Sequence, residues 1–200
     1  MAATEPQAAT PKRDLLLQCA RNLFAREGYH ATGVDRILDQ AGVAKMTLYN
    51  HFGSKEQLIV AVIDDASQSL VDELRAWTAR SDDPFEQVLL IFDALAARFE
   101  RPDGRGCLIQ AAAAEFSDLD SPVGQAIRRH HDRVQSLLLG IARATECADA
   151  PALAARLGLL IAGALSTART ALGREPAEQA KRIAEILLED ACRRPATGLE

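Results

Sequence analysis

Residues 32–55, TGVDRILDQAGVAKMTLYNHFGSK, constrain the fold of this 200-residue chain more than any other stretch. Apolar side chains recur at helical spacing over Val34–Ala41, and Gly42 ends that segment. A second short helix is predicted over Lys45–Phe52, directly after the turn. Two short helices that meet at a glycine turn form a helix-turn-helix, whose second helix enters the major groove of DNA.

The predicted second helix has one apolar side and one polar side. The polar side carries donors and flat rings suited to phosphates and base edges, and its residues are Lys45, Thr47, Tyr49, Asn50 and His51. A competing interpretation makes Leu48, Tyr49 and Phe52 the core of a helical bundle, and it suits Leu48 and Phe52. Tyr49 and His51 have polar tips and lie beside or opposite the apolar stripe, which favours DNA contact for this surface.

Capping residues predict where the flanking helices begin. Thr32 and Asp35 form a predicted capping pair for the first short helix. Ser54 and Gln57 do the same for a helix that begins at Lys55, which places this lysine beside the surface of the second helix.

Residues 12–63 resemble the DNA-binding domain of the TetR family of bacterial transcriptional repressors. The segments LFAREGYHATGVDRI and AGVAKMTLYNHFGSKEQL hold the family's pattern in order and without gaps. The resemblance implies a regulator that is not an enzyme and has no cofactor. The phosphate contacts that it implies are Thr32, Tyr49, His51 and Lys55, and the residues facing base edges are Lys45, Met46, Thr47 and Asn50.

Two positions depart from the family's pattern. Leu38 stands where the family usually has a small residue between the two helices, so slightly wider packing is expected there. Ala44 stands where a capping serine is common, so the second helix is expected to begin without a side-chain cap.

Composition places the chain among globular proteins rather than membrane or secreted ones. It is 48% hydrophobic and 26% charged. No membrane-spanning helix is expected, because a span needs an apolar run of roughly 18 residues. Residues 1–14 lack the apolar core of a signal peptide. The net charge is −5, but residues 1–55 hold seven Lys and Arg against five Asp and Glu, while the remainder holds 16 against 23. The basic excess therefore lies at the predicted DNA end. The expected location of the protein is the bacterial cytoplasm, in association with the nucleoid.

Four cysteines, at positions 19, 107, 147 and 192, show neither metal-ligand spacing nor the framework of a small disulfide-rich domain. A reducing cytoplasm is therefore the expected compartment. Cys19 falls on the apolar face of the first predicted helix and is assigned to the core.

The predicted fold is all-α, with about nine helices and no segment of strand-like alternation. Residues 1–11 are predicted to be a mobile tail, 12–54 a three-helix DNA-binding domain, 55–193 a helical ligand-binding and dimerisation domain, and 194–200 a second tail. One long helix beginning at Lys55 is expected to join the two domains.

The last two predicted helices, over 151–172 and 176–193, indicate a homodimer. Both carry apolar residues three and four apart, the seam of a coiled-coil-like pair, and TetR-like proteins dimerise through such a four-helix interface. The interface residues predicted here are Leu157, Ile161, Leu165, Ala168, Ala180, Ala184 and Leu187. The alternative is that both helices only complete the core of one subunit.

Large apolar residues of the middle helices predict a cavity for a small apolar ligand. They are Trp77, Phe85, Phe92, Phe99, Leu108, Phe116 and Leu137. By analogy with the family, a ligand that prefers the spread conformation would release the DNA through the long helix.

Cys107 suggests a second mode of regulation. It follows Arg105 and Gly106 at a predicted helix start, where backbone N–H groups and the guanidinium are expected to lower the pKa of the thiol. A similar glycine-cysteine-leucine segment occurs in a TetR subgroup that includes a sensor of electrophiles. Cys107 is thus a candidate redox or electrophile sensor, with a buried structural thiol as the alternative.

No residue pattern supports catalysis or metal binding. The run of residues 128–132, RRHHD, has no Glu-x-x-His partner on its helix and is assigned to a solvated face. The sequence therefore predicts a dimeric repressor that binds double-stranded palindromic operator DNA, with two recognition helices about 34–36 Å apart, and releases it on binding a small ligand. The alternative is an all-helical enzyme or carrier of an apolar small molecule.

Overall fold

The computed structural model describes residues 12–101, 107–170 and 173–192. These residues form nine helices and no strand, which confirms the all-α class. The helices are α1 (Lys12–Glu27), α2 (Val34–Ala41), α3 (Lys45–Phe52), α4 (Lys55–Thr78), α5 (Pro84–Phe99), α6 (Leu108–Glu115), α7 (Pro122–Ala144), α8 (Ala150–Thr167) and α9 (Glu175–Ala191).

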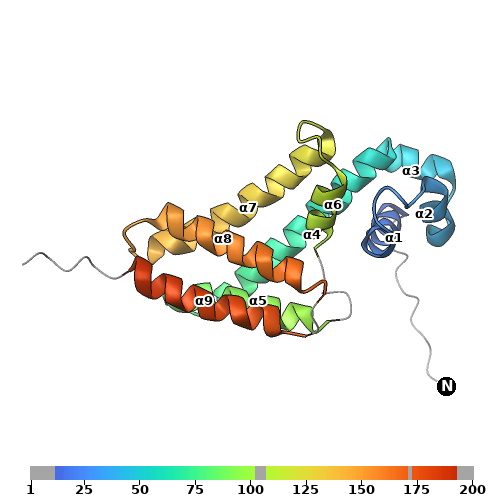
Figure 1. Cartoon of the computed structure of the whole chain (residues 1–200). Coiled ribbons are helices and arrows are strands. Elements are labelled where there is room, and N and C mark those ends of the chain that lie inside the picture. Colours follow the sequence, from blue (N-terminus) through green and yellow to red (C-terminus); the bar gives the residue numbers. More distant parts are fainter. Residues whose placement is uncertain (1–11, 102–106, 171–172, 193–200) are drawn as a thin grey trace, which may run out of the picture.

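The helices form a small group at one end and a larger bundle at the other (Figure 1). α1, α2 and α3 gather at one end, and α4 runs from them into the bundle that it builds with α5, α7, α8 and α9. The short α6 lies where the two groups meet and contacts α1, α4 and α7. The predicted tails, 1–11 and 194–200, lie outside the described residues.

The ends of the short helices follow the sequence signals, with one exception. Gly42 ends α2 with φ +63°, a conformation that glycine adopts without strain. Ala44 is the N-cap residue of α3 and supplies no side-chain cap, as predicted. The Ser54 hydroxyl caps α4 by accepting from the Gln57 N–H at 3.1 Å. The predicted capping by Thr32 is wrong, because Gly33 is the N-cap of α2 and no side chain caps it.

The core of the small group is closed by side chains from α1, α2 and α3 and from the beginning of α4. Leu23 and Phe24 of α1 are 1% exposed, while Ile37 of α2, Leu48 of α3 and Leu58 of α4 are fully buried. Because Leu58 belongs to the long helix, this small core and the beginning of α4 are packed as one unit.

Helix α8 corrects one expectation from composition. It has 18 residues with a mean hydropathy of 1.4, so by length and composition alone it could cross a membrane. In the structure 33% of it is buried. Core helices of globular proteins meet the same criterion of length and composition. Its buried side packs against α7 and α9, and its other side leaves Leu159 74% exposed.

Two of the four cysteines form a disulfide, which the expectation of a reducing cytoplasm did not include. Cys147, just after α7, forms a disulfide with Cys192, just after α9, and their Cα atoms are 4.5 Å apart. A separation of 45 residues cannot be recognised as a pair from spacing alone. Cys19 and Cys107 are free and buried, which agrees with the assignment of Cys19 to the core.

Candidate nucleic-acid interface and the cavity behind it

Helix α3 turns its apolar residues inward and its polar residues to solvent. Leu48 is fully buried and Phe52 is 9% exposed, so both belong to the core. Met46 is 68% and Tyr49 41% exposed. Lys45, Asn50 and His51 are exposed as well, and Thr47 is half-buried. The surface predicted to meet DNA therefore faces away from the protein.

The Lys45 ammonium has only a weak internal partner. Its Nζ lies 3.9 Å from Oδ1 of Asp35, and the two side chains are 62% and 86% exposed. An exposed ion pair of this kind contributes at most about 1 kcal/mol. Lys45 can therefore exchange the carboxylate for a phosphate at little cost.

Two of the predicted phosphate contacts have other roles in the structure. Thr32 is fully buried and its hydroxyl donates to the carbonyl of Gly28 at 2.6 Å, so its side chain does not reach the DNA-facing surface. The Lys55 ammonium donates to the carbonyl of Tyr29 at 2.8 Å. Both side chains hold the loop between α1 and α2. The bond of Thr32 is local, four residues back in the chain, whereas Lys55 reaches the loop from 26 residues further on.

Glu115, the last residue of α6, binds the same loop from the other side. Its Oε1 accepts from the backbone N–H of Tyr29 at 2.9 Å, and its Oε2 accepts from that of His30 at 2.7 Å. The Tyr29 hydroxyl donates to the carbonyl of Leu108 at 3.0 Å, at the other end of α6. Both ends of α6 are thus attached to the loop that leads into α2.

The ionisation of these groups reflects their burial and pairing. Burial alone would raise the pKa of Glu115, but the N–H groups of Tyr29 and His30, with the charges of His30 and Lys55, hold it below the ordinary value. Burial lowers the pKa of Lys55, which Glu115 partly offsets. Burial above all raises the pKa of Tyr29, so its hydroxyl remains a hydrogen-bond donor.

Aromatic rings complete this contact. The ring of Tyr29 stacks on Phe24 with centroids 4.7 Å apart and meets Phe116 edge-on at 5.8 Å. The ring of His30 lies 4.7 Å from Phe116. Phe116, expected to contact a ligand, is instead part of the junction between α6 and the DNA-binding helices.

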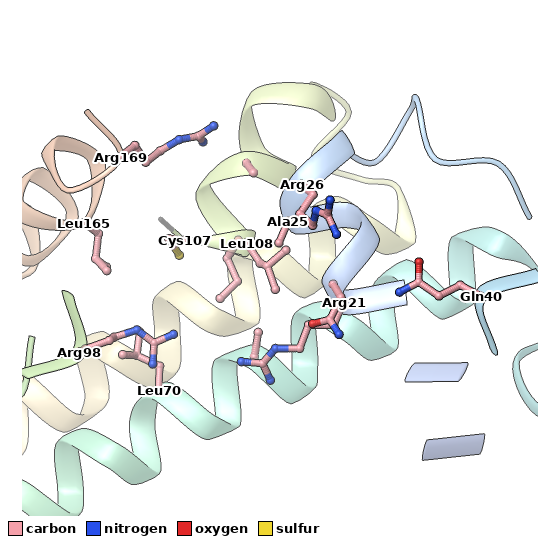
Figure 2. A pocket seen from close by; sticks show the side chains of 14 residues that line it. Arg21, Ala25, Arg26, Gln40, Leu70, Arg98, Cys107, Leu108, Leu165 and Arg169 are labelled. Carbon is pink, nitrogen blue, oxygen red and sulfur yellow. The ribbon is translucent and has the colours of Figure 1, made fainter. Parts of the chain in front are cut away.

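Behind this junction lies a cavity of about 560 Å³ (Figure 2). Its walls come from α1, α2, α4, α5, α6 and α8, so it separates the small group of helices from the larger bundle. Four arginines line it: Arg21 and Arg26 from α1, Arg98 from α5 and Arg169 just after α8. Figure 2 shows Arg98 and Arg169 on one side and Arg21, Arg26 and Gln40 on the other, with Cys107 and Leu108 between them.

The predicted ligand residues lie mostly outside this cavity, whose lining is mixed, with arginines beside apolar side chains. Of the seven, only Leu108 lines it. Phe92 and Phe99 are fully buried core residues. Phe85 lies in a separate surface groove between α5 and α9.

The remaining two predicted ligand residues are only partly buried. Trp77 lies under the guanidinium of Arg80, whose Cζ is 3.7 Å from the ring centroid. Leu137 packs against the core of the bundle. Large apolar residues at helical spacing fill a core more often than they line a cavity, which explains why most of the seven predicted ligand residues lie outside this one.

Cys107 faces the cavity as the N-cap residue of α6, but its expected activation is wrong. Burial raises the pKa of the thiol, while the N–H groups of Gln110 and Ile109 and the charges of Arg98 and Arg169 only partly offset this. Arg105, invoked for the activation, lies outside the described residues.

The predicted dimer residues are mostly buried inside one subunit. Leu157 and Ala184 are fully buried, Ile161, Leu165, Ala168 and Ala180 are at most 5% exposed, and Leu187 is partly buried. Their regular spacing marks the side of each helix that packs against its own subunit. The large apolar residues that α8 and α9 leave exposed are Leu159, Ile183 and Ile186.

The charged run of α7 is used for contacts between helices. Arg129 pairs with Asp64 of α4 at 2.8 Å, and Nδ1 of His130 lies 3.0 Å from the Ser67 hydroxyl. Within the described residues no group of three or more His, Cys, Asp or Glu side chains has the arrangement of a metal site.

Known proteins resemble this chain in both sequence and fold. The sequence model described as "Bacterial regulatory proteins, tetR family" matches residues 16–62. The chain is 34% identical to the HTH-type transcriptional repressor KstR2 of Mycolicibacterium smegmatis over 119 residues, which cover 60% of this chain and 58% of that protein. It is 28% identical to the HTH-type transcriptional regulator LmrA of Bacillus subtilis over 142 residues, or 70% and 76% of the two chains.

The fold agrees over a longer stretch. The structure of SCO4454, a TetR-family transcriptional regulator from Streptomyces coelicolor, superposes with a TM-score of 0.85 and 27% identity, covering 91% of this chain and 96% of that one. The helix-turn-helix, the bundle behind it and the sequence matches agree. Residues 16–62 thus carry the sequence pattern of the tetR family of bacterial regulatory proteins, and the chain is similar in sequence and fold to transcriptional regulators of that family.

Proposed function

We propose that this protein is a repressor that binds a palindromic DNA operator as a homodimer and releases it when a small molecule binds behind the DNA-binding helices. The observation that carries the proposal is the exposed side of α3, where Lys45, Met46, Tyr49, Asn50 and His51 face solvent while the opposite side is anchored in the core. Tyr49 and His51 are suited to phosphates, and Asn50 to the edge of adenine. Lys45, which the resemblance places at base edges, is assigned here to a phosphate, because its weak pair with Asp35 leaves the ammonium free to exchange.

The exposed faces of α8 and α9 support the dimer. On α8 the exposed residues Ala155, Leu159 and Ala162 follow one another at helical spacing, and on α9 Ile183 and Ile186 do the same. The two helices pack side by side (Figure 1). Exposed apolar residues on adjacent helices mark a surface that another protein surface covers, and a second copy covers it with a four-helix interface.

Helix α6 supplies the connection between ligand and DNA. Cys107 and Leu108 at its first turn line the cavity, and Glu115 at its last turn holds the loop before α2. α6 has eight residues, so it spans only about 12 Å. A ligand that favours a different position of α6 therefore shifts the population away from the DNA-binding arrangement of α2 and α3.

The proposed setting is the bacterial cytoplasm, on the nucleoid. The proteins to which the chain is similar are regulators, which supports this setting and disfavours the enzyme or carrier alternative.

The experiment is a fluorescence anisotropy titration of the full chain against labelled duplexes from the DNA flanking its own gene. Wild-type protein is expected to bind one palindromic duplex in preference to scrambled DNA. Asn50→Ala should relax the preference at particular base pairs, whereas Lys45→Ala should weaken binding to all sequences. The lysine change should also reduce the slope of log K against log salt by about 1 per subunit.

Arg143→Ala is the matched control, because Arg143 is an exposed cation at the end of α7 far from α3 (Figure 1). Equal binding of all duplexes by the wild type, or equal loss in Lys45→Ala and Arg143→Ala, would contradict the proposed function.

A further inference from the structure

The cavity behind the DNA-binding helices is strongly cationic. Four arginines line it, and no aspartate or glutamate is among the described residues that do so. Two of the four guanidinium groups are neutralised from outside the lining, Arg21 by Asp65 at 3.0 Å and Arg98 by Glu73 at 2.8 Å. The positive charge that remains inside the cavity is therefore that of Arg26 and Arg169.

Arg26 and Arg169 have no ion-pair partner within residues 12–101, 107–170 and 173–192, although most arginines of the bundle do. Arg26 belongs to the first helix of the DNA-binding group, and Arg169 follows α8. The two unpaired cations thus come from opposite sides of the junction. Both side chains are exposed, so water solvates them in the free protein and both guanidinium groups are available to a bound anion.

Arg98 adds a hydrogen-bond donor that points to the same conclusion. Its Nη1 bonds Glu73, but its Nε is buried and has no hydrogen-bond partner among the described residues. A buried N–H without an acceptor costs free energy, and native proteins rarely leave one unpaired. Arg98 and Arg169 are also the two charges that act on the Cys107 thiol, so both guanidinium groups lie close to that wall of the cavity.

Besides the arginines, the lining includes the polar Asn22 and Gln40 and several apolar side chains. Leu70 of α4, Leu108 of α6 and Leu165 of α8 contribute aliphatic surface between the arginines. The volume, about 560 Å³, falls within the range of roughly 300–1,000 Å³ that is typical of small-molecule sites. The cavity therefore suits a molecule with one anionic end and an apolar body.

We propose that this cavity binds a small organic anion, a carboxylate or a phosphate on an apolar body, whose charged end is held by Arg98 and Arg169 and whose body contacts Leu70, Leu108 and Leu165. Arg26 adds positive potential from α1. The inference rests on the proposed function, because it names the class of molecule that releases the DNA.

Calorimetric titration of the full chain at low ionic strength tests this with three probes that share one tail: octanoate, octyl phosphate and 1-octanol. At least one anion should bind about tenfold or more tightly than 1-octanol, since charge-assisted hydrogen bonds of arginine are worth at least this factor. The better of the two anions distinguishes a carboxylate from a phosphate. Equal binding of 1-octanol, or no binding of any probe, would overturn the proposal.

Variants assign the site. Arg169→Gln should weaken anion binding about tenfold and leave 1-octanol unchanged, Arg169→Lys should restore part of the affinity, and Arg26→Gln should have a smaller effect. The control is Arg143→Gln, an exposed arginine at the far end of α7. Thermal melting checks that each variant is folded. Unchanged anion binding in Arg169→Gln, or an equal loss in the control, would overturn the assignment.

Binding of operator DNA is also measured on the same samples without any probe. This measurement distinguishes a failure of the proposed ligand class from a failure of the proposed function. Intact DNA binding with no anion binding overturns only the ligand class. Anion binding without DNA binding overturns only the proposed function.

Discussion

The carboxylate of Glu115 accepts a 2.9 Å hydrogen bond from the backbone N–H of Tyr29, 86 residues earlier in the chain. The second carboxylate oxygen accepts from the N–H of His30. The loop between α1 and α2 has few partners of its own for these N–H groups, so α6 provides them. The DNA-binding helices are in this way attached to the wall of the cavity.

Replacing Glu115 by alanine should loosen this attachment. The variant leaves two N–H groups without an acceptor, so the free energy of unfolding in urea should fall by about 1–3 kcal/mol. Amide hydrogen exchange at Tyr29 and His30 should accelerate. Asp132→Ala is the control, since this exposed residue of α7 forms no ion pair within the described chain. Unchanged exchange at both amides would show that the attachment does not order the loop.

Two glycine-to-alanine changes should have opposite effects. Gly28 has φ +87°, and an added Cβ would lie 3.0 Å from Oε1 of Glu115. Gly28→Ala should therefore lower the melting temperature, by an amount equivalent to about 1–2 kcal/mol. Gly140→Ala in α7 meets nothing within 4 Å and should stabilise by up to about 1 kcal/mol. Shifts of the same sign would contradict the described loop geometry.

His130 should make stability depend on pH. Burial above all, together with His131 and Arg133, lowers its pKa from 6.5 to about 4. Because the unfolded chain binds the proton first, the contribution of neutral His130 is complete above pH 6.5 and is lost as the pH falls toward 4. This group alone should reduce the free energy of unfolding by about 2 kcal/mol between pH 7 and pH 5.

Urea unfolding of His130→Gln at both pH values checks this, with the exposed His51 of α3 changed in His51→Gln as the control. The pH-dependent loss should shrink in the His130 variant and persist in the control. The same loss in both variants would mean that another group is responsible.

A charge on the exposed side of α8 should separate the subunits. Leu159 is 74% exposed, and a glutamate in the proposed interface would be desolvated without a partner. Leu159→Glu should therefore sediment as a monomer at concentrations where the wild type is a dimer. Leu119→Glu, at a residue 53% exposed before α7, should remain dimeric. A dimeric Leu159 variant would exclude this face as the interface.

The helix-turn-helix could be predicted from the sequence because its signals are local. The bounds of α2 and α3, the turn at Gly42, and the burial of Leu48 beside the exposed Tyr49 all follow from helical spacing and one glycine. In the cap at Ser54 the interacting groups lie only three residues apart.

The cavity and the junction could not be predicted in this way. Tyr29 is the largest fully buried side chain, yet it lies in a loop, and its partner Glu115 is distant in sequence. The four arginines of the cavity come from three separate parts of the chain. On α8 the spacing of Leu157 and Ile161 marks a buried side, but it does not reveal that the covering surface belongs to the same subunit.

Hydroxyl-radical footprinting of the wild-type protein on its selected operator tests the central claim most directly. Two α3 helices related by a two-fold axis should protect two half-sites on one face of the duplex, with centres about 34–36 Å or 10–10.5 base pairs apart. Asn50→Ala should weaken both half-sites equally. Protection of a single half-site, or a pattern that the α3 variant leaves unchanged, would contradict the account.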